Sequence, residues 1–172
     1  MDLYAARLTN ANVYINGVDL LGRASDIELP QIKHKMDEYK GLGMAGSPKF
    51  WGGVDELEAK INFVWLDPSY LGAVMNPLQW PQIMVRGYEQ QYTAGGMVAE
   101  VPVIAMLTGV WKEMPKVSFK PHESQPVESA LTVYYYLLTI GALPQVEIDV
   151  MANIFKVQGE DVLANFRAIL GG

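Results

Sequence analysis

The sequence of 172 residues has no cysteine, only two histidines and no long hydrophobic run. Without cysteine, disulfides, thiolate metal sites and cysteine nucleophiles are excluded. The 13 basic residues against 19 acidic ones give a net charge of −6, so the chain lacks the basic footprint of a protein that grips phosphates. No apolar run approaches the roughly 20 residues that span a bilayer, and the first residues do not resemble a signal peptide. We therefore expect no tight nucleic-acid binding, no export and no membrane insertion.

The residues that are present are typical of one globular domain. Half of them are hydrophobic and 10% are aromatic, so the chain can bury a core. The length fits a single domain covering residues 1–172. The 16 glycines and 10 prolines separate short apolar segments, which is typical of an all-β chain. We predict a mainly β fold, an antiparallel β-sandwich or barrel-like protomer with one short internal helix and a C-terminal helix.

Local signals place these elements along the chain. Asn16-Gly17 favours a type I′ turn between strands at 12–15 and 18–21, because both turn positions need positive φ. Apolar and polar residues alternate over 57–65, which predicts a strand with one buried face. Asp67-Pro68 begins a short helix that Asn76-Pro77 ends. Further elements are expected as strands at 24–29, 82–92, 97–107, 127–140, 146–151 and 154–157, and as a helix at 161–170.

The segment Gln31–Gly53 shows no usable periodicity and is predicted to be a long loop. Within it, Gly41–Gly46 matches the G-x-G-x-x-G pattern of dinucleotide-binding folds, but the β-α-β context that this motif needs is missing. No cofactor is therefore expected. Met44, Phe50 and Trp51 are apolar residues in a polar stretch, which favours a loop that orders against a neighbouring molecule. The alternative is a loop folded back on its own core.

Candidate catalytic side chains are few and poorly spaced. His34 and His122 lack the nucleophile, carboxylate or ligand spacing of a triad or a metal site, and are expected at the surface. The carboxylates cluster on adjacent or alternate residues, where they face water and not two sides of a cleft. Side chains alternate along a strand, so Tyr134 and Tyr136 share a face without Tyr135, and packing is favoured over base stacking. We predict no catalytic and no metal-binding residues; the carboxylates concerned are Asp37, Glu38, Asp55, Glu56 and Glu58.

Seven short segments, in a fixed order along the chain, match a family pattern. They are Thr9–Gly17, Glu28–Pro30, Lys33–Tyr39, Gly41–Gly46, Tyr134–Ile140, Val146–Asp149 and Asn153-Ile154. With the terminal helix, they resemble the major tail tube proteins of contractile-tailed phages over essentially the whole chain. The middle, from about Trp65 to Pro115, matches in its layout of a helix followed by a hairpin.

The resemblance implies a structural subunit and not an enzyme. Six copies would form a ring whose sheets join into a continuous inner β-barrel, and the rings would stack into a conduit for DNA ejection. The loop at 31–53 would reach the adjacent ring, and the contact residues implied are Lys40, Gly41, Gly43, Met44, Gly46, Phe50 and Trp51. An acidic chain suits such a conduit, because a lumen with the sign of the phosphates resists adhesion.

The resemblance also implies partners and a location. Besides copies of the chain, the partners would be the tail sheath, tape measure, baseplate and tail terminator proteins, and DNA would pass without specific binding. The location would be the virion tail, assembled in the host cytoplasm. Two other functions stay open: the inner tube of a headless contractile device such as an R-type bacteriocin, and a small β-barrel protein that binds an apolar ligand.

Overall fold

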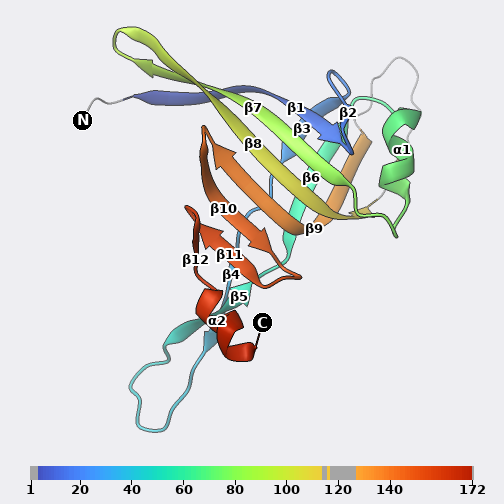
Figure 1. Cartoon of the computed structure of the whole chain (residues 1–172). Helices are drawn as coiled ribbons and strands as arrows, with labels where there is room; N and C mark the ends of the chain where they lie inside the picture. The colour runs from blue at the N-terminus through green and yellow to red at the C-terminus, as the bar shows by residue number, and fades with distance from the viewer. Residues whose placement is uncertain (1–3, 114–115, 117–126, 172) are drawn as a thin grey trace.

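Antiparallel strands make up most of the computed structural model, which describes residues 4–113, 116 and 127–171 (Figure 1). The predicted fold class, mainly β with one internal and one C-terminal helix, is confirmed. The elements are β1 (Ala5–Ile15), β2 (Val18–Asp19), β3 (Ala24–Glu28), β4 (His34–Glu38), β5 (Lys49–Val54), β6 (Leu57–Phe63), α1 (Pro68–Met75), β7 (Gln82–Thr93), β8 (Gly96–Glu113), β9 (Val127–Ile140), β10 (Leu143–Asp149), β11 (Ile154–Val157), β12 (Glu160–Asp161) and α2 (Ala164–Leu170).

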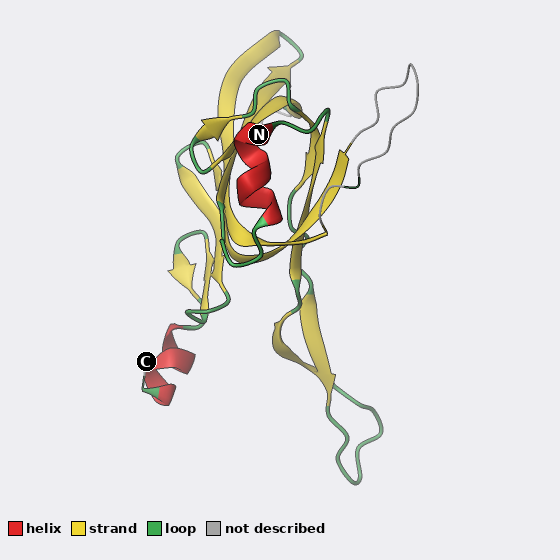
Figure 2. Cartoon of the chain, turned by 90° about the vertical axis from the view of Figure 1, so that its right-hand side faces the viewer, coloured by secondary structure: helices red, strands yellow, loops and turns green. Residues whose placement is uncertain are grey.

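Ten of the strands form one sheet that curls into an open barrel (Figure 2). The sheet runs in the order β12-β11-β10-β9-β8-β7-β1-β2, and β6 joins it by pairing with both β9 and β3. The long β9 makes this branching possible, because its first half pairs with β6 and its second half with β10. Over the described strands, β1 and β3 do not pair, so the barrel is open between them.

The first hairpin forms as predicted. Asn16 and Gly17 have φ angles of 49° and 80°, which match the two positive values that a type I′ turn requires. The first strand begins earlier than predicted, at Ala5, because its first residues pair with β7. The second hairpin is also confirmed, and β8 extends six residues beyond the predicted end at Leu107.

The core lies inside the barrel, beneath α1. Along β6 the residues Leu57, Ala59, Ile61 and Phe63 are all buried, which confirms the predicted alternation. The ring of Phe63 stacks on Tyr70 of α1, with centroids 4.2 Å apart. The Asp67 side chain caps α1 by accepting a hydrogen bond from Ser69 N at 2.8 Å, as the Asp-Pro signal predicted. The helix therefore closes one end of the barrel (Figure 2).

The prediction of a long loop at 31–53 is wrong in part, because β4 and β5 pair within it to form a hairpin. The sequence hid these strands because all five residues of β4 are exposed, so neither face is apolar and no alternation appears. The pairing is also interrupted by a register shift between Lys35 and Met36. The loop proper is residues 39–48, which we call the tip of the hairpin.

Two predictions at the end of the chain need correction. A register shift opposite Thr108 and Gly109 leaves Tyr134 unpaired with β8. Tyr136 is therefore buried in the core while Tyr134 stacks on Trp80, so the two tyrosines do not share a face. The C-terminal helix is shorter than 161–170, because Asp161 pairs with Lys156 as part of β12. Its stop is as expected: Gly171, at φ 85°, caps it in the left-handed conformation.

Candidate assembly surfaces

The β4–β5 hairpin carries all seven of the predicted contact residues. In the tip are Lys40, Gly41, Gly43, Met44 and Gly46, and on β5 are Phe50 and Trp51. Tyr39 N donates a hydrogen bond to Pro48 O at 2.9 Å and so closes the tip. Gly43 has a φ of 83°, a conformation that glycine adopts without strain. The hairpin extends away from the barrel, so the alternative of a loop folded back on the core does not hold (Figure 2).

Phe50 and Trp51 belong to different clusters, because neighbouring residues of a strand point to opposite faces. Phe50 packs edge-on against Tyr39 beside the tip, with ring centroids 6.2 Å apart. Trp51 instead stacks on Phe155 of β11 at 6.5 Å, and its Nε1 donates to His34 Nδ1 at 3.1 Å. Trp51 thus fixes the base of the hairpin. His34 lies at the surface as predicted, whereas His122 lies outside the described residues.

The tip presents apolar side chains to solvent. Leu42 is fully exposed, and Tyr39, Met44 and Phe50 are each about half exposed. Exposed apolar side chains that are this close in the chain, and that no core underlies, are typical of an interaction site in a folded protein.

A groove separates the base of the hairpin from the C-terminal unit, residues 143–171. Its volume is about 540 Å³. One wall comes from the segment Trp51–Val54, and the other from β10, β11 and α2. The apolar residues of the second wall are Ile148, Val150, Ile154, Phe155, Leu163 and Phe166. This groove could not be predicted from the sequence, because its two walls are about 100 residues apart in the chain.

No residue of α2 is buried, so the helix is not held by core packing. Polar contacts of one arginine hold it beside the groove instead. Arg167 donates to Asn153 O at 2.8 Å and pairs with Asp161 at 2.5 Å. The hydrogen bond from Arg167 lowers the pKa of the Asp161 carboxyl, with the charge of the guanidinium acting in the same direction. Large apolar side chains of this helix are also exposed: Phe166, Ile169 and Leu170 are 50%, 85% and 68% exposed.

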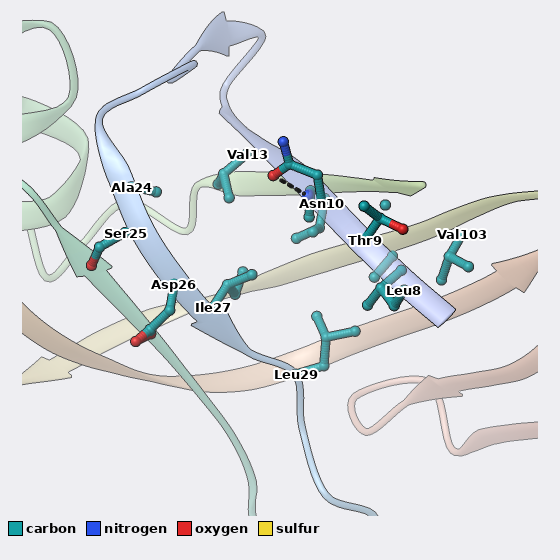
Figure 3. A pocket seen from close by; sticks show the side chains of 14 residues that line it. Leu8, Thr9, Asn10, Val13, Ala24, Ser25, Asp26, Ile27, Leu29 and Val103 are labelled. Carbon is teal, nitrogen blue, oxygen red and sulfur yellow. Dashed lines mark hydrogen bonds between the residues drawn. The ribbon is translucent and has the colours of Figure 1, made fainter. Parts of the chain in front are cut away.

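The arm formed by β1, β7 and the first part of β8 has one open strand edge on each side. The first edge belongs to β1, which pairs with β2 only at Tyr14 and Ile15. A cavity of about 280 Å³ lies between this edge and β3 (Figure 3). There the side-chain oxygen Oδ1 of Asn10 accepts a hydrogen bond from Ala11 N at 2.9 Å, so this backbone N–H has a partner within the chain. The second edge belongs to β8 over 96–102, because β9 pairs with β8 only from Val103 onward.

The face of the sheet opposite the core carries carboxylates that bond to side chains of the neighbouring strand. Tyr88 donates to Glu100 Oε1 at 2.5 Å, and this bond raises the pKa of the tyrosine hydroxyl. Glu147 of β10 is paired with Lys156 at 2.9 Å. These bonds tie neighbouring strands together on a surface that the barrel interior does not cover.

Two further carboxylates, Glu56 and Glu58, take part in a local ion pair. Lys112 pairs with both Glu56 and Glu58, and a hydrogen bond from Thr132 is the main cause that lowers the pKa of Glu56. Among the described residues, no three or more histidine or acidic side chains gather as they would around a metal ion. Neither described helix has the length and hydrophobicity of a membrane span.

Together, these features define a subunit built for assembly. The barrel interior, where a ligand-binding barrel would hold its ligand, is filled by Phe63, Tyr70 and Trp111, and the groove of about 540 Å³ lies outside it. The open strand edges, the apolar tip and the groove all lie at the surface. The small ligand-binding barrel is therefore disfavoured.

Comparisons with known proteins identify the family. The model for phage tail tube protein FII matches residues 5–171, so the chain belongs to this family. It is 27% identical to the tail tube protein of Escherichia phage P2, over 96% of both chains. The predicted family, the tail tube proteins of contractile-tailed phages, is thereby confirmed, and with it the role of a structural tail protein.

Solved structures support the fold. One neighbour is a chain of the sheath–tube complex of the PVC extracellular contractile injection system in its extended state, with a TM-score of 0.50 and 11% identity. It matches over 75% of this chain and 87% of that one. A chain of the sheath/tube terminator of the same system has a TM-score of 0.52 and 10% identity, over 75% and 92% of the two chains.

Proposed function

We propose that six copies of this chain form a ring, and that such rings stack into the inner tube of a contractile tail through which DNA passes. The observation that carries the proposal is the pair of open edges on β1 and β8. An unpaired edge in an isolated subunit invites uncontrolled pairing, whereas a closed ring can pair these two edges with each other. The edge of β1 in one copy would meet the edge of β8 in the next.

Exposed apolar side chains beside these edges fit a buried interface. Leu8 on β1 and Val98 on β8 are both 59% exposed in the single chain. Joining the edges would cover both side chains and add backbone hydrogen bonds between copies. The hairpin tip, which projects beyond the barrel, would then contact the adjacent ring.

Charges placed on the two edges should prevent ring formation. In the double variant Leu8→Lys and Val98→Lys, we expect a folded monomer, because lysines on an edge oppose strand pairing. Native mass spectrometry should show six-chain species for the unmodified protein and single chains of 19.1 kDa for the variant. The control Leu21→Lys changes a residue that is 73% exposed on the turn before β3 and should still form rings. Rings formed equally by the double variant would count against edge pairing.

The proposed lumen wall is the face of the sheet opposite the core. Ile83 and Val85 of β7 are buried. Side chains alternate along a strand, so Arg86, the residue after Val85, lies on the other face. Along β7, the first half of β8, and β10, that face carries Arg86 and three carboxylates, Glu100, Glu147 and Asp149, of which Glu147 is paired with Lys156 of β11. An excess of carboxylates would keep passing DNA from adhering.

Reversing a charge on this wall should slow DNA passage. Phage carrying Glu147→Lys, on a strand that is paired on both sides, would gain six cations in every ring, and we expect ejection to be several-fold slower. The control Glu28→Lys reverses an exposed carboxylate on β3, away from the proposed wall. Equal ejection rates for both phages would contradict the placement of the lumen.

The proposal extends to partners and place of assembly. The two structural neighbours come from a sheath–tube complex and a sheath/tube terminator, which supports sheath and terminator proteins as partners of this tube. By family membership we add tape measure and baseplate proteins, and assembly in the host cytoplasm. The second candidate is the tube of a headless contractile device, favoured by the same two neighbours because their system is an injection device.

A further inference from the structure

We propose that the groove between the hairpin base and the C-terminal unit is the receptor for the hairpin tip of another copy. The inference rests on the proposed stacking of rings and names the surface by which one ring holds the next. Leu42 and Met44 would be the inserted side chains, and Phe166 of α2 would cover them.

The size and lining of the groove fit such an insertion. A volume of about 540 Å³ lies within the roughly 300–1,000 Å³ of pockets that enclose a small ligand, so it can take a few side chains but not a whole element. Its floor is the Trp51–Phe155 stack, and Phe166 lies in its wall while half exposed. An apolar occupant would remove this surface from water, which is favourable in proportion to the area covered.

The tip of the same chain does not occupy the groove. Trp51, Gly52 and Gly53 line it from the base of the hairpin, and the tip lies at the far end. Figure 2 shows the tip pointing away from α2. The tip and the groove therefore lie on the same chain, and the tip would enter the groove of a different copy.

Charge is compatible with this pairing of surfaces. The tip carries no carboxylate and one lysine, Lys40, whose Nζ lies 3.4 Å from Glu38 at the end of β4. The C-terminal unit has four carboxylates, of which Glu147 and Asp161 are neutralised by Lys156 and Arg167. The other two are Asp149, which lines the groove, and Glu160; no salt bridge joins either to a cation among the described residues. The border of the groove thus carries an excess of negative charge, and the tip brings no carboxylate to oppose it.

The geometry of this contact produces growth in one direction. A surface that inserts into a different surface of an identical copy makes a head-to-tail contact, which repeats without closing unless the rotation completes a ring. Such a contact suits rings that stack indefinitely. Arg167 is a positioning residue here, since it holds α2 and thereby Phe166 over the groove.

A disulfide between copies tests the contact directly, because the natural chain has no cysteine. In tubes of the double variant Leu42→Cys and Phe166→Cys, mild oxidation should give a ladder of linked chains on a non-reducing gel. The control pair Leu42→Cys and Leu78→Cys uses a residue that is 90% exposed but does not line the groove, and it should stay unlinked.

A second pair of variants gives an independent result should the cysteine variant fail to stack. Phe166→Ser should release rings that no longer form tubes, whereas Ile169→Ser, on the same helix but outside the groove, should leave tubes intact. Tubes without a ladder, or tubes of Phe166→Ser, would overturn the groove assignment and leave the proposed function standing. An unmodified protein that never forms tubes would overturn both.

Discussion

Replacing residues 39–48 by an Asn-Gly turn should leave free rings that no longer stack into tubes. Glu38 and Lys49 are the last paired residues of β4 and β5, so a two-residue type I′ turn can join them without disturbing the hairpin. The change removes the exposed apolar tip while keeping the Trp51–Phe155 contact at the base. Sedimentation of the purified variant should therefore show the ring as its largest species.

The control for this deletion is a single substitution that keeps the full length of the tip. Ser47→Ala alters an exposed tip residue outside the predicted contact set, and tubes should form as in the unmodified protein. Tubes of normal length from the shortened hairpin would contradict the role of the tip between rings. Loss of rings as well as tubes would place the hairpin in the ring interface instead.

Replacing Phe63 by alanine should have the largest effect on the stability of the single chain. The ring is fully buried, stacks on Tyr70 at 4.2 Å and contacts Trp111 at 6.2 Å. Removing a buried phenylalanine leaves a cavity and costs about 3–5 kcal/mol in the free energy of unfolding. Because α1 is held to the barrel through Tyr70, the same change should loosen this helix.

The measurement is urea unfolding followed by circular dichroism. It should be made in the monomeric Leu8→Lys and Val98→Lys background, so that assembly does not add to the apparent stability. Phe50→Ala makes the same chemical change at an exposed site and should cost less than about 1 kcal/mol. Equal losses for the two variants would show that the core does not centre on Phe63.

The sequence predicted those parts of the fold in which local chemistry decides the outcome. Asn16-Gly17 specifies a turn through backbone conformation alone, and Asp67 caps α1 through its own side chain. The alternation along β6 is visible because one face of that strand packs in the core. In each case the determining residues lie within a few positions of one another.

The errors arose where distant residues or missing burial decide the structure. β4 is exposed on both faces, so pairing with β5 leaves no hydrophobic pattern. The bulge at Tyr134 depends on Gly109 in the neighbouring strand, where a Cβ atom would lie 2.1 Å from Thr132 O. Such a site tolerates only glycine, but the sequence of one strand does not reveal the register of the next.

Of the two candidate assembly surfaces, the tip could be predicted from the sequence and the groove could not. The tip could be predicted because apolar residues among glycines in a polar stretch stand out locally. The groove could not, because Trp51 meets Phe155 and Phe166 only once the hairpin and the C-terminal unit descend side by side from the barrel. Contact between the tip and another ring remains a prediction.

Electron microscopy of the purified, unmodified protein in negative stain shows whether the chain assembles into tubes. We expect rings with sixfold symmetry that stack into hollow tubes as the protein concentration rises. Single particles of 19.1 kDa at every concentration, without rings or tubes, would contradict this expectation.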